Sequence, residues 1–146
     1  MTGDDLIALA GSLAASTGLG GAEARYRSAV SRAYYGAYHL AVALLAECGA
    51  SIRTSAYGHN DVYVCLWESG YDPARQAARH LSQLRTERNR ADYRLDDYRF
   101  RVPANAMQAV EMAYDVKRCL EACRNDPAAL DAIQRGIEAW RNRAGR

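Results

Sequence analysis

Apolar residues recur along most of the chain at alternating spacings of three and four positions, the period of amphipathic helices. Six such segments are separated by short breaks, and each of the three prolines lies where a periodic segment begins. The helices are predicted at residues 4–16, 22–48, 62–68 and 73–95, from 103 onward, and at 127–143. This pattern predicts an all-α fold, an antiparallel bundle of about five to six helices in one domain over residues 1–146.

The first two predicted helices differ in length. Leu6, Leu9 and Leu13 share one face of the first, which ends at a flexible break over residues 17–21. The second carries a long apolar stripe that includes Val30, Ala33, Ala37, Leu40 or Ala41, and Leu44. We therefore expect the second helix to lie at the centre of the bundle.

The third segment has two possible structures. Residues 49–58 are predicted as a loop that continues to His59, and Asn60 and Asp61 are predicted to cap the segment that follows. Residues 62–67 form a continuous apolar run that periodicity cannot distinguish from a buried strand. Because no partner strand is visible elsewhere, we predict a helix.

Residues 31–39 combine small side chains with three tyrosines. The small residues, among them Gly36, would let another helix approach closely, while the tyrosines project elsewhere. Tyrosine is common both in protein cores and at subunit interfaces. We favour a structural role for this stretch as a close helix contact.

One arginine interrupts the apolar stripe of the fourth predicted helix. Arg88 stands where the pattern requires an apolar side chain, in the stripe formed by Ala74, Ala77, Leu81, Leu84, Ala91 and Leu95. A surface pair with Asp92, four residues on, would contribute only ~0.3–0.5 kcal/mol, too little to explain this position. Arg88 therefore marks either an internal ion pair or a groove where helices meet around a ligand.

Composition narrows the class of protein. The net charge is +2 and the basic residues are almost all arginines, with Lys117 the single lysine. Arginine binds phosphate with two parallel hydrogen bonds, but the arginines of residues 85–101 are interspersed with acids, so net charge alone does not indicate nucleic acid. No apolar run approaches the ~20 residues of a membrane span, and the acidic start is unlike a secretory signal. We expect a cytoplasmic protein with no membrane association.

The four cysteines lie within apolar helical runs and are expected as free thiols. Cys119 and Cys123 are one helical turn apart, but no second pair of Cys or His with ligand-like spacing accompanies them. We expect no metal and no cofactor. Phosphate-binding loops, zinc-protease motifs and serine elbows are also absent from the sequence.

Three motifs in order and spacing resemble the HEPN family: Ser-Arg-Ala-Tyr-Tyr-Gly-Ala-Tyr-His at 31–39, Tyr-Gly-His-Asn at 57–60, and Arg-Asn-Arg-Ala-Asp-Tyr at 88–93. The last is similar to a branch that carries Arg-Asn-x-Ala-Asp-Tyr. The resemblance covers roughly residues 20–125, with the C-terminal helix and its basic tail outside it. It implies a helical bundle that forms a homodimer, with two arginine motifs facing each other across a cleft.

The resemblance also implies a chemistry. Active HEPN ribonucleases cut RNA without metal through an Arg-x(4 to 6)-His motif, in which arginine holds the phosphate and histidine moves the proton. Arg88 would be the arginine and Asn89 its polar neighbour, but Tyr93 stands where the histidine is expected. A phenol ionises near pH ~10 and is a poor general base, so the resemblance implies that His59 or Tyr93 would have to replace the histidine.

Three functions follow from the resemblance. The first is a metal-independent endoribonuclease of toxin or defence type, with Arg88, His59 and Tyr93 as catalytic residues. The second is a non-catalytic module that binds RNA, a nucleotide or a partner protein in the same cleft. The third is pairing with a nucleotidyltransferase antitoxin that modifies Tyr93 or Tyr98. The residues expected to bind RNA or ligand are Arg85, Asn89, Asp92, Arg32 and Tyr35.

Overall fold

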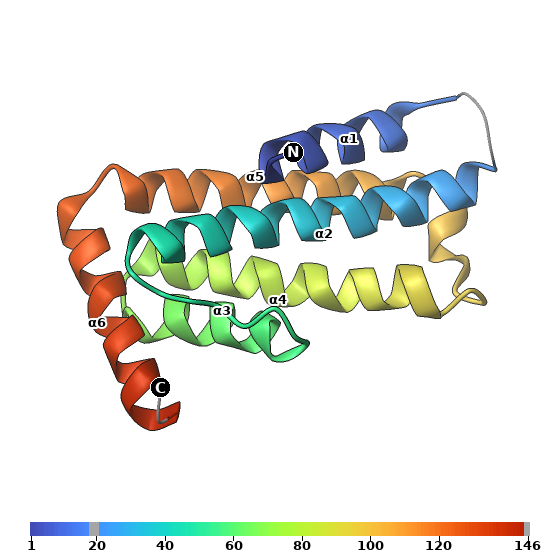
Figure 1. Cartoon of the computed structure of the whole chain (residues 1–146). Coiled ribbons are helices and arrows are strands. Elements are labelled where there is room, and N and C mark those ends of the chain that lie inside the picture. Colours follow the sequence, from blue (N-terminus) through green and yellow to red (C-terminus); the bar gives the residue numbers. More distant parts are fainter. Residues whose placement is uncertain (18–20, 145–146) are drawn as a thin grey trace.

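The computed structural model describes residues 1–17 and 21–144, and within these ranges it consists of helices with no strand (Figure 1). The elements are α1 (Gly3–Ala15), α2 (Ala22–Glu47), α3 (Tyr57–Glu68), α4 (Asp72–Tyr93), the short 3₁₀ helix η1 (Tyr98–Arg101), α5 (Ala104–Arg124) and α6 (Pro127–Ala144). The predicted all-α bundle is confirmed, and so is the prediction of a helix rather than a strand at 62–68. The predicted break at 17–21 lies partly outside the described residues.

The three long helices α2, α4 and α5 lie side by side, with α4 antiparallel to the other two (Figure 1). α1 packs against α2 and α5, and α3 packs against α4. α6 crosses one end of the bundle and packs mainly against α3. α2 contacts four other helices and η1, which confirms its predicted central position. Its buried stripe includes Val30, Ala33, Ala37 and Leu44, with Ala41 rather than Leu40 at the position left open.

α1 begins with a capping box, because the side chain of Thr2 and that of Asp5 each bind the other's backbone NH. Its buried face differs from the predicted one. Ile7, Ala10 and Ala14 face the core together with Leu6, while Leu9 is 45% exposed. The prediction that Leu9 lies on the buried face was therefore wrong. The contact between α1 and α2 sets the orientation of α1, and in that orientation Ile7 rather than Leu9 faces the core.

That contact is made by glycines, which confirms that small residues in 31–39 admit a second helix. A Cβ atom at Gly36 would lie 2.6 Å from Cγ1 of Ile7 and 2.8 Å from the carbonyl oxygen of Gly3. A Cβ atom at Gly3 would in turn lie 2.5 Å from the carbonyl oxygen of Gly36. The two helices therefore approach more closely than any side chain would allow.

We expect Gly36→Ala to lower the free energy of unfolding by about 1–2 kcal/mol, because overpacking outweighs the better helix propensity of alanine. Urea unfolding followed by circular dichroism measures the change. Gly11→Ala is the matched control, since its Cβ would meet only Val110 at 3.9 Å. A Gly36→Ala protein as stable as the Gly11→Ala protein would contradict the close contact.

α3 begins five residues earlier than predicted, so residues 57–60 form its first turn rather than a loop. Asn60 and Asp61 are not caps. Asp61 is buried and accepts a hydrogen bond of 2.7 Å from Nε of Arg53, which reaches it from the preceding loop. A Cβ atom at Gly58 would clash with the carbonyl oxygen of Arg53. This ion pair with the buried Asp61 and the glycine contact fix the loop against α3, which the local sequence pattern did not indicate.

The basic C-terminal segment is partly bound to the bundle. Arg143 forms an ion pair of 2.6 Å with Glu68 on α3, and Arg141 donates a hydrogen bond to the carbonyl oxygen of Gly49. Arg146 lies outside the described residues. The predicted basic tail thus extends α6 and helps to hold it across the end of the bundle.

Candidate functional site

Arg88 lies inside the bundle, as its position on the apolar stripe predicted. Its exposed fraction is 7%, and its nearest carboxylate is Asp92, with 3.8 Å between Nη1 and Oδ2. That distance is longer than a hydrogen bond. Nε of Arg88 is buried and has no hydrogen-bond partner among the described residues. The guanidinium is therefore enclosed, with Asp92 as an ion-pair partner beyond hydrogen-bond distance and with its Nε unpartnered among the described residues.

Three tyrosine rings surround the Arg88 guanidinium. Its central carbon lies 5.5 Å from the ring centroid of Tyr34, 5.3 Å from Tyr35 and 5.9 Å from Tyr93. Cation–π contacts of this kind offset part of the cost of removing a charge from water. The rings offer no hydrogen-bond acceptor comparable to a carboxylate, so the N–H groups of the guanidinium gain fewer hydrogen bonds than they would beside a carboxylate.

Polar contacts join α2 to the same cluster. Ser31 Oγ donates a hydrogen bond of 3.3 Å to Asp92, and Arg32 lies 3.4 Å from Ser31 Oγ and over the ring of Tyr35. The structure thus brings together five of the residues expected from the sequence. These residues, which we call the Arg88 cluster, are Arg32, Tyr35, Arg88, Asp92 and Tyr93.

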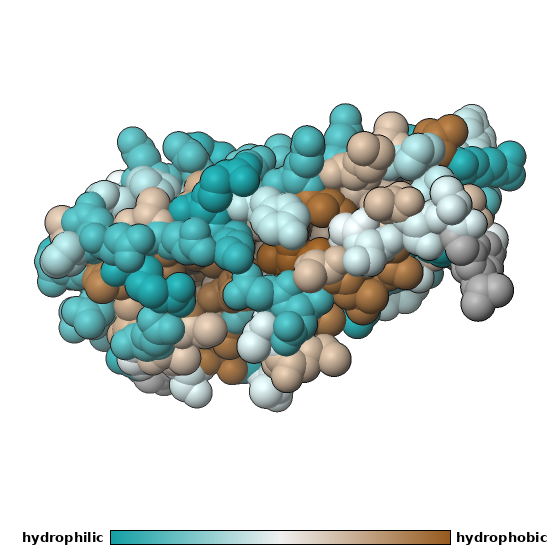
Figure 2. Space-filling model, turned by 90° about the horizontal axis from the view of Figure 1, so that it is seen from above, coloured by the Kyte–Doolittle hydropathy of each residue, from teal (hydrophilic) through white to brown (hydrophobic). Residues whose placement is uncertain are grey.

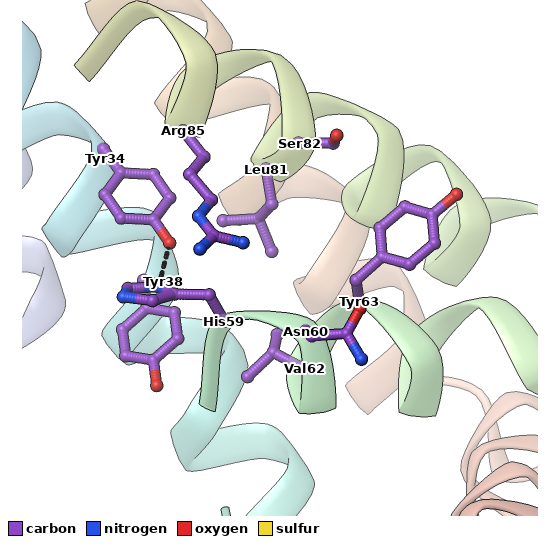
Figure 3. A pocket seen from close by; sticks show the side chains of 9 residues that line it. All are labelled: Tyr34, Tyr38, His59, Asn60, Val62, Tyr63, Leu81, Ser82 and Arg85. Carbon is purple, nitrogen blue, oxygen red and sulfur yellow. Dashed lines mark hydrogen bonds between the residues drawn. The ribbon is translucent and has the colours of Figure 1, made fainter. Parts of the chain in front are cut away.

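His59 lies beside this cluster, on the first turn of α3. It forms a hydrogen bond through Nδ1 with the hydroxyl of Tyr34 (Figure 3), and the Tyr34 ring also contacts the Arg88 guanidinium. His59 also lines a cavity of about 240 Å³ between α3 and α4. Arg85 points into this cavity from α4 (Figure 3). Tyr38, Asn60 and Tyr63 also line it.

The surroundings keep both partners of the hydrogen bond neutral. Burial, followed by the positive charges of Arg85 and Arg88, lowers the pKa of His59 below its usual value. Burial also raises the pKa of Tyr34, against the opposing charges of the same arginines. Near pH 7, His59 is therefore an uncharged imidazole that can donate or accept one proton.

The lowered pKa of His59 predicts a pH dependence of stability. A histidine whose pKa is lower in the folded state takes up its proton more readily in the unfolded chain. We expect the free energy of unfolding to fall as pH drops below about 6.5, the ordinary value, and to level off below the folded pKa. Urea unfolding between pH 7.5 and about 5 measures this for wild type, His59→Gln and, as control, exposed His39→Gln. Only His59→Gln should flatten the slope, and an unchanged slope would contradict the prediction.

Asn89 does not line the cavity that contains His59. It lies on the exposed side of α4, in a depression of about 370 Å³ that Tyr93 and Arg90 also line. Tyr93 therefore connects the Arg88 cluster to this outer depression.

A second buried arginine was missed in the sequence. Arg27 of α2 is 7% exposed, pairs with Glu23, and lies over the ring of Phe100. Its guanidinium donates hydrogen bonds of 2.8–3.4 Å to the carbonyl oxygens of Arg90, Ala91, Arg94, Leu95 and Asp97. It thereby caps the C-terminal end of α4, where the last carbonyls have no partner within the helix.

The spacing of apolar residues in the sequence already indicates that the two missed residues, Arg27 and Tyr34, are buried. Arg27 and Tyr34 continue the three-and-four spacing of Val30, Ala37 and Ala41, so both fall on the core-facing stripe of α2. Like Arg88, Arg27 is a charged residue at a position where the spacing requires an apolar one. The same criterion therefore indicates a buried arginine in α2.

The remaining features offer less chemistry. Cys119 and Cys123 are free thiols, and no group of three or more His, Cys, Asp or Glu in the described ranges could hold a metal ion. An apolar groove between α1 and α5 includes Ala14, Met107 and Val110, with Glu111 its one ionisable residue. Figure 2, which looks down on the side of α1, shows hydrophobic atoms gathered in the middle of this face. None of the described helices combines the length and apolar character needed to cross a membrane.

Comparisons of the chain with protein families, with curated proteins and with solved structures find no match. The function is therefore argued from the residues and their geometry.

Proposed function

We propose that this chain is a HEPN-like protein of toxin or defence type that binds RNA through the Arg88 cluster as a homodimer. The observation that carries the proposal is the buried Arg88 guanidinium, which has an unpartnered Nε and no carboxylate within hydrogen-bond distance. A guanidinium in this state favours an incoming anion, and phosphate can accept two parallel hydrogen bonds from it.

The neighbouring groups suit a phosphodiester better than a small cofactor. Arg85 adds a second positive charge in the adjoining cavity, and it has no ion pair among the described residues. The cavity of about 240 Å³ is below the roughly 300–1,000 Å³ of typical small-molecule pockets. It suits one phosphate or base of a longer chain.

Exposed apolar side chains near the cluster support a dimer. Tyr93, Leu95 and Tyr98 are each more than 70% exposed, at the end of α4 and the start of η1. A second copy of the chain, related by twofold symmetry, would cover these three side chains. The two Arg88 motifs would then lie close together. The exposed hydroxyls of Tyr93 and Tyr98 would also be accessible to a nucleotidyltransferase partner, as the HEPN resemblance implies.

Metal-independent cleavage is the second candidate function. His59 is neutral near pH 7 and shares its cavity with Arg85, so it could take the 2′-hydroxyl proton while the arginines stabilise charge on the phosphate. Nδ1 of His59 is already occupied by the hydrogen bond with the hydroxyl of Tyr34, which favours binding over cleavage within one subunit.

Fluorescence anisotropy with labelled single-stranded RNA, in excess chelator, tests the first proposal. We expect binding that weakens with salt and that Arg88→Gln reduces by at least about tenfold. Arg118→Gln on α5 is the control for net charge, because Arg118 pairs only with Asp115 on the surface. Binding that is equal in both variants would refute the Arg88 site.

The same mixtures test cleavage. Products that end in a 2′,3′-cyclic phosphate, and that disappear in His59→Ala, would establish a metal-independent ribonuclease. Binding without products would leave a non-catalytic module.

A further inference from the structure

The cavity beside the Arg88 cluster lies at the seam between α3 and α4, where Tyr63 and Arg85 line it. Tyr63 lines the cavity, and its ring stacks nearly parallel on that of Trp67, with 5.8 Å between centroids and an angle of 8°. Figure 3 shows Tyr63 on the side of the cavity away from Tyr34. The two rings therefore form a flat aromatic step, and its Tyr63 end lines the cavity.

Two arginines of α4 cover this step. The guanidinium carbons of Arg75 and Arg79 lie 4.7 Å and 5.1 Å from the ring centroid of Trp67. Arg75 is also held by a hydrogen bond of 3.0 Å from Nε to the carbonyl oxygen of Trp67. Arg79 is exposed and forms no ion pair in the part of the chain that the structure describes.

Acidic side chains near the seam are already paired. Asp61 is buried with Arg53, and Glu68 is bound by Arg143 of α6. Neither neutralises Arg79 or Arg85. The seam thus carries the positive charges of Arg79 and Arg85 beside the aromatic rings of Tyr63 and Trp67.

We propose that the seam binds single-stranded RNA, with bases stacked on the Tyr63 ring and on the Arg79 guanidinium plane that lies over Trp67, and with phosphates following Arg79 and Arg85 to the Arg88 cluster. Unpaired bases stack on aromatic rings and on guanidinium planes, whereas the bases of a duplex are already stacked on each other. This inference rests on the proposed RNA binding and names the strand type and its path.

The length of the seam determines how many nucleotides of a single strand it can contact. His59 and Trp67 are eight positions apart on α3, about 12 Å at a rise of 1.5 Å per residue. That distance corresponds to roughly three to four stacked nucleotides at about 3.4 Å each. A hexanucleotide that starts at His59 reaches Trp67 and Arg79, and a dinucleotide bound in the cavity does not.

The test compares the affinities of hexauridine and the dinucleotide UpU by calorimetry. Trp67→Leu removes the ring against which Tyr63 and the Arg79 guanidinium lie, so it should weaken hexauridine binding about tenfold and leave UpU unchanged. Arg79→Gln, an exposed change that spares the fold, should weaken hexauridine and lower the salt dependence of its binding by about 0.7 in slope. Arg118→Gln again controls for net charge.

Three outcomes would overturn the inference, and they are distinguishable. Wild-type affinity for hexauridine in both Trp67→Leu and Arg79→Gln would show that the strand does not follow the seam, while the Arg88 site could still bind RNA. Equal or tighter binding of a six-base-pair duplex would contradict the preference for a single strand. No binding of either oligonucleotide by the wild-type protein would refute the proposed function itself.

Discussion

Replacing Arg27 with methionine is expected to lower the free energy of unfolding by about 3–5 kcal/mol, the range for breaking a buried charge network. The substitution leaves the carbonyl oxygens at the end of α4 without their donor, and it leaves Glu23 with only its longer contact of 3.8 Å to Arg101 among the described residues. Each unsatisfied buried acceptor costs about 1–3 kcal/mol, and water entering the site recovers part of that cost. Urea unfolding measures the loss.

The control for Arg27→Met is Arg118→Met, which removes an equal charge from a surface pair of α5. Exposed pairs contribute about 0–1 kcal/mol, so this variant should stay close to wild type. If Arg27→Met is no less stable than Arg118→Met, Arg27 does not hold the end of α4. Because the same end positions Asp92 and Tyr93, Arg27→Met should also weaken RNA binding.

Arg88→Lys is expected to weaken RNA binding by about tenfold or more while the melting temperature changes little. Lysine keeps the charge and can still contact the rings of Tyr34 and Tyr35, but it loses the planar fork that binds phosphate in two places. Hydrogen bonds to charged groups contribute about 1.5–3 kcal/mol, which corresponds to roughly 10- to 150-fold in affinity. Anisotropy and thermal unfolding on the same samples separate the two effects.

A structural role for Arg88 would give the opposite result. If Arg88→Lys lowers the melting temperature by many degrees and leaves RNA affinity unchanged, the guanidinium serves to hold the tyrosines. Asp92→Asn distinguishes further, since its carboxylate lies 3.8 Å from Arg88 and contributes little to stability at that distance. Loss of the negative charge beside the site should strengthen RNA binding slightly.

Most of the fold was predictable because helix periodicity is local. The spacing of apolar residues gave the helices and the burial of Arg88, and the prolines gave the starts of α4, α5 and α6 to within one residue. The start of α3 was missed because it depends on the ion pair between Arg53 and the buried Asp61, which no periodic pattern marks. Leu9 was misplaced because two faces of α1 are apolar, and the glycine contact with α2 selects between them.

The candidate site was predictable in part. The sequence indicated that Arg88, Asp92 and Tyr93 share a region, and their closeness on one helix explains why. It did not indicate that Tyr34 would contact both Arg88 and His59, since these residues come from three different helices.

The sequence by itself determined which segments are helical and which arginines fall on buried faces, because both follow from spacing over a few turns. The tertiary structure alone decided what those arginines meet. Arg27 meets carbonyl oxygens more than sixty residues away, and Arg88 meets tyrosines from two helices. Such contacts depend on how the helices cross, which is set by close packing across the whole bundle and not by any local pattern.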